Sequence, residues 1–164
     1  MKKYMLAAAV LVAIGSCGKK NKFTCTVATM DKPAGDSAVL FVPNAFSPNE
    51  DGLNDRFYIQ GLGVSSIAWS VYDQENKLVF SAGSMTEYWE PHTTFPQGMT
   101  TYHYTLEAVT ELGNKISRCG DFYAYTCVPE NFSMKDITFG DQYNPGAPEY
   151  ISPASHEVFR KCSE

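Results

Sequence analysis

Two long segments of alternating apolar and polar residues, joined by a short polar turn, constrain the fold of this chain more than any other feature. The first segment places four residues on one face: Tyr102, Tyr104, Leu106 and Ala108. The second runs from Ile116 to Cys127, after the turn at residues 111–114. Alternation with a period of two is typical of a β-strand that buries one face. The two segments therefore predict a long β-hairpin.

Shorter segments of the same character lie before this hairpin, separated by Gly, Pro and Asn residues. They are residues 23–28, 39–42, 57–60, 67–72 and 78–80. The sequence between residues 23 and 128 shows no helical periodicity. About seven short strands separated by such turns predict an all-β fold, a β-sandwich of two sheets.

Proline residues set the region after residue 128 apart. They stand at four positions: Pro129, Pro145, Pro148 and Pro153. Because proline interrupts regular elements, residues 129–164 are predicted to form an irregular C-terminal extension. Ser152 and Pro153 form a helix-start signal, with serine as the N-cap and proline at the first helical position. They predict one short helix through Lys161.

The N-terminus carries the pattern of an export signal. Two lysines precede an apolar run at residues 5–14, which has about ten residues and is too short for a bilayer that needs about twenty. Residues 14–17, Ile-Gly-Ser-Cys, resemble a bacterial lipobox. We therefore expect residues 1–16 to be a lipoprotein signal peptide and Cys17 to be lipidated. An ordinary secreted protein cut near Ser16 is the alternative.

The residues after Cys17 bear on localisation. Gly18 stands where an inner-membrane retention signal carries Asp, which by resemblance to sorted lipoproteins indicates the outer membrane. Residues 18–22 lack the acidic cluster of many surface-exported lipoproteins, which favours the periplasmic face over the cell surface. We expect residues 17–37 to form a lipidated N-terminal segment that includes the first strand and is held to the membrane by its lipid.

The charge balance argues against nucleic acid as a partner. The chain has 13 basic and 18 acidic side chains and a formal net charge of −5. Loss of residues 1–16 removes two lysines and leaves a net charge of about −7. Outside Lys19, Lys20 and Lys22 the sequence has no basic stripe. These lysines lie beside the expected lipid, where they either contact head groups or are solvated.

Four cysteines remain when Cys17 is set aside: Cys25, Cys119, Cys127 and Cys162. An even number in an exported protein predicts disulfide bonds, and four cysteines allow three pairings. Cys119 and Cys127 would be about 26 Å apart on one extended strand. We therefore expect each of them to pair with Cys25 or Cys162. A zinc site is the alternative, but it has no C-x-x-C spacing to support it.

The most informative segment is residues 42–57, V-P-N-A-F-S-P-N-E-D-G-L-N-D-R-F. It resembles the opening signature of the gliding motility-associated C-terminal domain, the type B sorting domain of the type IX secretion system in Bacteroidetes. The signature positions are Pro43, Asn44, Phe46, Pro48, Asn49, Asp51, Gly52, Asn54, Asp55 and Phe57. Residues 69–73, 77–80 and 96–104 resemble later blocks of the family. The resemblance implies an immunoglobulin-like sandwich, which we assign to residues 38–128.

The position of this domain bears on function. In a sorted cargo protein of the family the domain closes the chain, whereas about 37 residues follow Cys127 here. We therefore expect a non-enzymatic cell-envelope lipoprotein whose domain is an interaction module for secretion or gliding machinery. The alternative is a small substrate that type IX secretion exports through this domain. The absence of G-x-S-x-G and H-E-x-x-H motifs argues against an enzyme.

A further alternative is a surface glycan-binding or adhesion module. Four tyrosines on the long hairpin would supply a stacking face for sugars: Tyr102, Tyr104, Tyr123 and Tyr125. Cross-strand packing of aromatic side chains inside the sandwich is the simpler explanation.

The signature also contains oxygen donors at a spacing that echoes a calcium loop. They are Asn49, Asp51, Asn54 and Asp55, with Gly52 permitting a tight turn. Position 58, where an EF-hand carries its bidentate glutamate, holds tyrosine. The alternative is a series of Asx turns, in which these side chains accept hydrogen bonds from nearby backbone N–H groups without an ion.

Overall fold

The computed structural model describes residues 23–25, 27–91 and 95–163. The expected signal peptide, residues 1–16, and the expected lipid site, Cys17, lie outside the described residues. The described part contains seven strands: β1 (Val39–Phe41), β2 (Ala45–Phe46), β3 (Gln60–Leu62), β4 (Val64–Tyr72), β5 (Leu78–Ala82), β6 (Met99–Thr110) and β7 (Lys115–Tyr125). Two short 3₁₀ helices follow: η1 (Gly140–Gln142) and η2 (Pro148–Tyr150).

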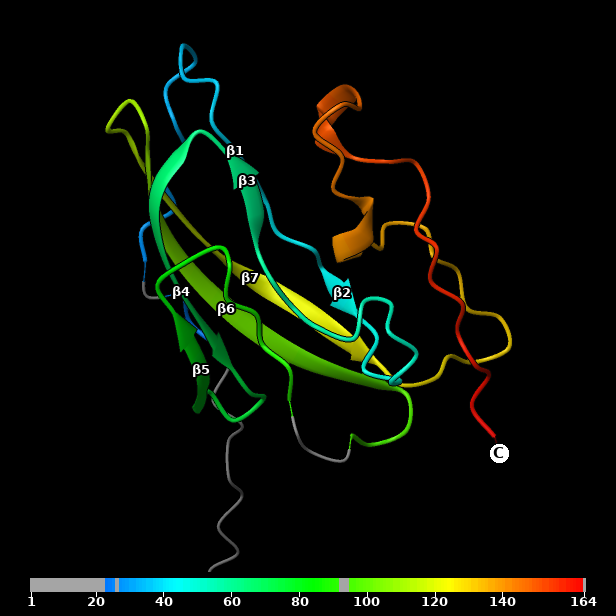
Figure 1. Cartoon of the computed structure of the whole chain (residues 1–164). Coiled ribbons are helices and arrows are strands. Elements are labelled where there is room, and N and C mark those ends of the chain that lie inside the picture. The colour runs from blue at the N-terminus through cyan, green and yellow to red at the C-terminus, as the bar shows by residue number, and fades with distance from the viewer. Residues whose placement is uncertain (1–22, 26, 92–94, 164) are drawn as a thin grey trace, which may run out of the picture.

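The strands form two sheets. Five strands lie in the order β2-β7-β6-β4-β5, and β1 pairs with β3 in a second, two-stranded sheet. All paired strands are antiparallel except β2 and β7, which run parallel. The C-terminal extension, residues 129–164, runs beside β2 and the end of β7 (Figure 1). The predicted all-β, immunoglobulin-like two-sheet sandwich is confirmed.

The hairpin of β6 and β7 is the largest pairing in the structure. Its register is unbroken from Met99 opposite Tyr125 to Val109 opposite Lys115. In the connecting turn, Gly113 has a φ of 82°, a left-handed conformation that glycine adopts without strain. The long hairpin predicted from alternation is therefore confirmed.

Aromatic side chains dominate the core between the sheets. Phe46, Phe57 and Phe122 are fully buried, and the rings of Phe57 and Phe122 stack with centroids 3.8 Å apart. Burial of one such side chain stabilises a fold by about 2–3 kcal/mol. Phe46 and Phe57 both come from the signature, so the core fixes the two ends of that segment on the sandwich.

Strand β3 approaches β1 closely because residue 61 is glycine. A Cβ atom at Gly61 would lie 2.3 Å from the carbonyl oxygen of Val39, so any other residue would force the two strands apart. This pairing closes the second side of the core, where Leu40 packs with the aromatic cluster.

Two disulfide bonds tie the ends of the described chain to β7. Cys25 bonds to Cys119, and Cys127 bonds to Cys162. The disulfide prediction is confirmed, including the expectation that Cys119 and Cys127 do not bond each other. Because a crosslink limits the freedom of the unfolded chain, each bond stabilises the fold.

Two predicted elements are wrong. The described residues of 23–28 form no strand, because this segment crosses the outer face of the sheet and is held there by side chains. Cys25 bonds to β7, and the ring of Phe23 stacks on His103 at 4.4 Å. Two residues after this segment, Met30 forms a single antiparallel bridge with Ser117.

The short helix predicted from Ser152 to Lys161 is also wrong: the described residues carry no helix there, and Ile151 and Lys161 form isolated β-bridges. Ser152 does not cap a helix, because its backbone N–H donates to the Gln142 carbonyl and its hydroxyl accepts from Asn144. At the far end a parallel bridge joins Lys161 to Val128. Tertiary hydrogen bonds therefore override the local helix-start signal.

Candidate functional site

The signature segment, residues 43–57, divides into three groups of side chains. Phe46 and Phe57 lie in the core, and Pro43 is buried beside them. A second group shapes the loop between these anchors. A third group, the asparagines Asn44, Asn49 and Asn54, faces the C-terminal extension through side-chain hydrogen bonds. We refer to this third group as the asparagine surface.

Asp55 organises the loop. Its carboxylate accepts hydrogen bonds from the backbone N–H groups of Asn49 at 3.1 Å, Glu50 at 2.8 Å and Gly52 at 2.8 Å. Asp51 accepts from the N–H of Leu53 at 2.9 Å in the same manner. Gly52 has a φ of 89°, which its missing side chain permits. The loop therefore holds its shape through its own backbone.

These contacts bear on the expected calcium site. The oxygens of Asn49, Asp51 and Asp55 each accept hydrogen bonds from the loop backbone, and Asn54 accepts one from the extension. Among the described residues, no group of three or more His, Cys, Asp or Glu side chains is arranged to hold a metal ion. The Asx-turn alternative accounts for this geometry, and calcium binding stays a prediction for experiment.

Asn44 joins the start of the signature to the extension. Its side-chain oxygen accepts a hydrogen bond from the N–H of Thr138 at 2.7 Å, and its side-chain amide donates to the carbonyl of Asp136 at 2.9 Å. The backbone N–H groups of Asn44 and Ala45 both donate to the carbonyl of Thr138. The extension thus lies along the edge of the sandwich at the start of β2.

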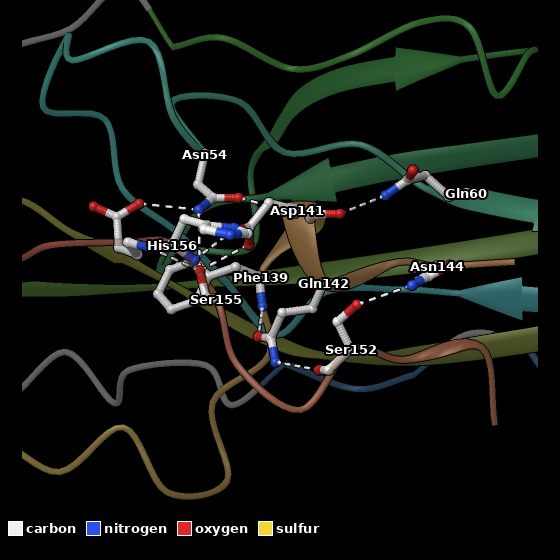
Figure 2. A network of polar contacts seen from close by, with 11 residues as sticks. Asn54, Gln60, Phe139, Asp141, Gln142, Asn144, Ser152, Ser155 and His156 are labelled. Atoms are coloured by element: carbon white, nitrogen blue, oxygen red, sulfur yellow. Dashed lines mark hydrogen bonds and ion pairs between the residues drawn. The ribbon is translucent and has the colours of Figure 1, made fainter. Parts of the chain in front are cut away.

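Asn54 is the centre of a larger polar network, which Figure 2 shows from close by. Its oxygen accepts from the N–H of Asp141 at 3.1 Å, and its amide donates to the Glu157 carboxylate at 3.0 Å. The amide of Asn49 approaches the other Glu157 oxygen at 3.5 Å. A glutamate of the extension is therefore held between two asparagines of the signature.

Burial decides the electrostatics of this contact. Glu157 is 6% exposed, and burial raises the pKa of its carboxyl group, against hydrogen bonds from Asn54 and Ser47 that lower it. Asp51 and Asp141 lie near and act in the same direction as burial. The site contacts the carboxyl through neutral amides and a hydroxyl, so desolvation is not balanced by a direct positive charge.

Asp141 behaves in the opposite way. Burial acts to raise its pKa, but hydrogen bonds from the backbone of His156 and the hydroxyl of Ser155 outweigh it and lower the pKa. The Ser155 hydroxyl lies 2.7 Å from the Asp141 carboxylate and the His156 N–H at 2.8 Å. The ionised Asp141 carboxylate therefore accepts the hydrogen bonds that hold residues 155–157 in place.

An apolar cluster lies beside the polar network. Its buried members are Ala45, Tyr125, Val128 and Phe139, packed with Tyr123, Phe132, Ile137 and Phe159. The ring of Phe159 lies 5.5 Å from Tyr125 and 5.7 Å from Phe139. The extension therefore covers the outer face of β2 and β7 with aromatic rings as well as with hydrogen bonds.

Residues 40–120 match the family model of the CHU_C Type IX secretion signal domain. The chain carries a type IX secretion signal domain. The family resemblance predicted from residues 42–57 is thereby confirmed. No curated protein and no solved structure matches the chain. The matched residues of the type IX secretion signal domain end within β7, so the extension that covers its signature lies beyond them.

The residues that complete the site were not predicted. Asp141, Ser155 and Glu157 belong to the part of the chain read as irregular, far in sequence from the signature of the type IX secretion signal domain. The sequence carries no signal for them, because the less exposed positions of this segment include the polar residues Ser155 and Glu157 while Val158 is exposed. An apolar–polar alternation would have indicated an extended segment with one buried face.

The tyrosines expected to form a glycan-stacking face do not share one. Tyr102 lies opposite Phe122 on the core face of the hairpin, where both rings pack together. Tyr123 pairs with Thr101 and directly follows Phe122 in β7. Because successive residues of a strand point to opposite faces, Tyr123 points to the other face of the sheet. Tyr123 and Tyr125 contact the extension's apolar cluster instead. Core and cluster packing account for all four rings.

No helix in the part of the chain that the structure describes is long and apolar enough to cross a membrane.

Proposed function

We propose that the protein is a non-enzymatic lipoprotein of the cell envelope, in which the type IX secretion signal domain serves as an interaction module for secretion or gliding machinery. The family match supports a type IX secretion-related, envelope-associated role. The lipobox-like residues 14–17 support an anchor at Cys17, and residues 18–22 favour the periplasmic face of the outer membrane.

One observation carries the choice of an interaction module over an export signal. All three residues of the asparagine surface are hydrogen-bonded to the chain's own extension. A sorting signal acts through its exposed surface, whereas here three asparagines of the signature are engaged by the chain's own extension, although residues 50–52 stay exposed. These contacts favour an interaction module over a sorting signal that has to be exposed to the secretion machinery.

In the part of the chain that the structure describes, the cysteines and His103 are engaged in structural contacts. The four described cysteines are in disulfides. His103 pairs with Asp121 at 2.7 Å and stacks on Phe23. These contacts support a role in binding rather than in chemistry.

The alternative, a small substrate of type IX secretion, is favoured by the family match alone. The two are separated by blotting cell fractions and medium from the parent strain and from a strain that lacks the secretion channel. Loss of the channel leaves an envelope module in the outer-membrane fraction. Accumulation in the periplasm only in the channel-deficient strain would instead identify a secreted substrate. Substitution of Cys17 by Ser tests the anchor, since it should release the protein from membranes.

A further inference from the structure

Residues 155–161 lie on the domain in the manner of a bound peptide. Ser155, Glu157 and Phe159 face the domain, while the residues between them are exposed. The far end is fixed by backbone pairing: the Val128 N–H donates to the Arg160 carbonyl at 2.9 Å, and the Cys162 N–H to the Val128 carbonyl at 3.0 Å. Extended ligands of β-proteins bind in this way, with backbone hydrogen bonds and alternate side chains in pockets.

The loop that receives Glu157 takes its shape from contacts inside itself. Asp55 holds the backbone of residues 49–52, and the anchors Phe46 and Phe57 lie in the core. The loop therefore fixes the backbone of both asparagines: the Ser47 N–H donates to the Asn54 carbonyl at 2.8 Å, and the Asn49 amide donates to Asp51 at 2.9 Å. The extension meets a loop whose backbone is already shaped. A prepared surface loses less entropy on binding than one that has to be ordered.

We propose that Asn49 and Asn54 of the asparagine surface, together with the adjoining outer face of β2 and β7, form a peptide-binding site, which residues 155–159 fill in cis. The ligand in trans is an extended segment of another protein, with a glutamate carboxyl between Asn49 and Asn54 and an aromatic ring two residues later, against Tyr125. This inference rests on the proposed interaction module and names its binding surface.

The Cys127–Cys162 bond is what favours the cis occupant. It closes residues 128–161 into a loop anchored next to the site, so the local concentration of Glu157 at the asparagine surface is high. A ligand in trans competes with the segment in cis. Its apparent affinity equals its intrinsic affinity multiplied by the fraction of molecules in which the site is open. Removing the crosslink and the glutamate therefore uncovers the site.

The test uses the full chain in an opened form, C127S/C162S/E157A, beside the parent protein. The probe is a fluorescent synthetic peptide with the sequence of residues 150–161, and binding is measured by fluorescence anisotropy. The opened protein should bind the peptide at least about tenfold more tightly than the parent, because the cis segment no longer competes. Near-ultraviolet circular dichroism and size-exclusion chromatography report whether the opened protein is folded and monomeric.

Two peptide variants locate the contact. Replacing the glutamate by alanine (E157A in the peptide) should weaken binding about tenfold or more, the loss expected for a buried hydrogen-bonded carboxyl. The matched control, V158A, changes a side chain that is 77% exposed and should leave the affinity unchanged. If Asn54→Ala is added to the opened protein, the difference in affinity between the glutamate and alanine peptides should shrink, because Asn49 is then the one asparagine left facing the carboxyl.

Three results would overturn the proposal. They are a folded opened protein that binds no peptide, equal affinities for the glutamate and alanine peptides, and loss of the native near-ultraviolet spectrum on opening, which would make the extension an inseparable part of the fold. Dimers of the opened protein would assign the surface to exchange between copies and so exclude a separate partner. These readouts are independent of the cell-fraction experiment that tests the proposed function.

Discussion

Asn54→Ala should destabilise the protein strongly, because it removes two hydrogen bonds at once. The change removes a hydrogen bond to the buried Glu157 carboxyl at 3.0 Å and one from the N–H of Asp141 at 3.1 Å. A hydrogen bond to a charged group contributes about 1.5–3 kcal/mol, and a neutral one about 1 kcal/mol. The two lost contacts therefore cost about 3 kcal/mol.

A second cost arises from the backbone. Asn54 has a φ of 52°, and alanine in the left-handed region is less favourable by about 1 kcal/mol. Asn76 provides the matched control, because its φ is 64° and it lies in the β4–β5 turn, away from the extension. Asn76→Ala carries the same type of backbone cost and also removes the contacts of the Asn76 side chain. The excess loss of stability in Asn54→Ala is therefore a lower limit for the contacts with the extension.

The measurement is urea unfolding followed by the fluorescence of Trp69 and Trp89, which are both buried. With an m-value of about 2 kcal/mol/M, the Asn54→Ala midpoint should lie about 1.5 M below that of Asn76→Ala. Hydrogen exchange at the Asp141 amide should become faster in Asn54→Ala alone. Equal midpoints for the two variants would refute the reasoning, because the network around Asn54 would then contribute no more to stability than the side chain of Asn76.

Three further outcomes are expected. Phe57→Ala should lower the free energy of unfolding by about 3–5 kcal/mol through an unfilled core site, and a loss below 1 kcal/mol in urea unfolding would contradict the packing described. Burial raises the pKa of Glu157 above the ordinary value of 4.5, so its favourable contribution is complete below that pH and is lost as the pH rises through the raised pKa. Glu157→Gln should flatten this decline in a pH series of unfolding midpoints, and an unchanged slope would count against it. If the signature loop consists of Asx turns, the melting temperature should be the same in calcium and in chelator, whereas a higher value in calcium would establish an ion at Asn49, Asp51, Asn54 and Asp55.

The parts of the structure that follow from local pattern were predictable. Alternation over a few residues predicts the β6–β7 hairpin and the buried strands. The family signature indicates the position of Phe57. The exclusion of a Cys119–Cys127 bond followed from the length of an extended strand, whereas the choice between Cys25 and Cys162 as partners did not. In each case the deciding interaction is short in sequence or is fixed by simple geometry.

The contacts of the extension were not predictable in the same way. Asn44 meets Thr138 and Asn54 meets Glu157 across about a hundred residues, and nothing near either residue specifies the other. The expected helix after Ser152 failed for the same reason, because the hydrogen-bond partners of Ser152, Ser155 and His156 come from residues 141–144. Tertiary hydrogen bonds, which local propensity does not describe, therefore determine the conformation of this segment.

The two disulfides also define how the molecule would carry mechanical load. A pull applied between the residues before Cys25 and those after Cys162 passes through the first disulfide to Cys119, along β7 to Cys127, and out through the second disulfide. Residues 26–118 and 128–161 lie outside this covalent path and transmit no tension along the chain. The protein would therefore behave under tension as a short inextensible link, in which β7 carries the load while the rest of the sandwich and the extension lie outside the covalent path.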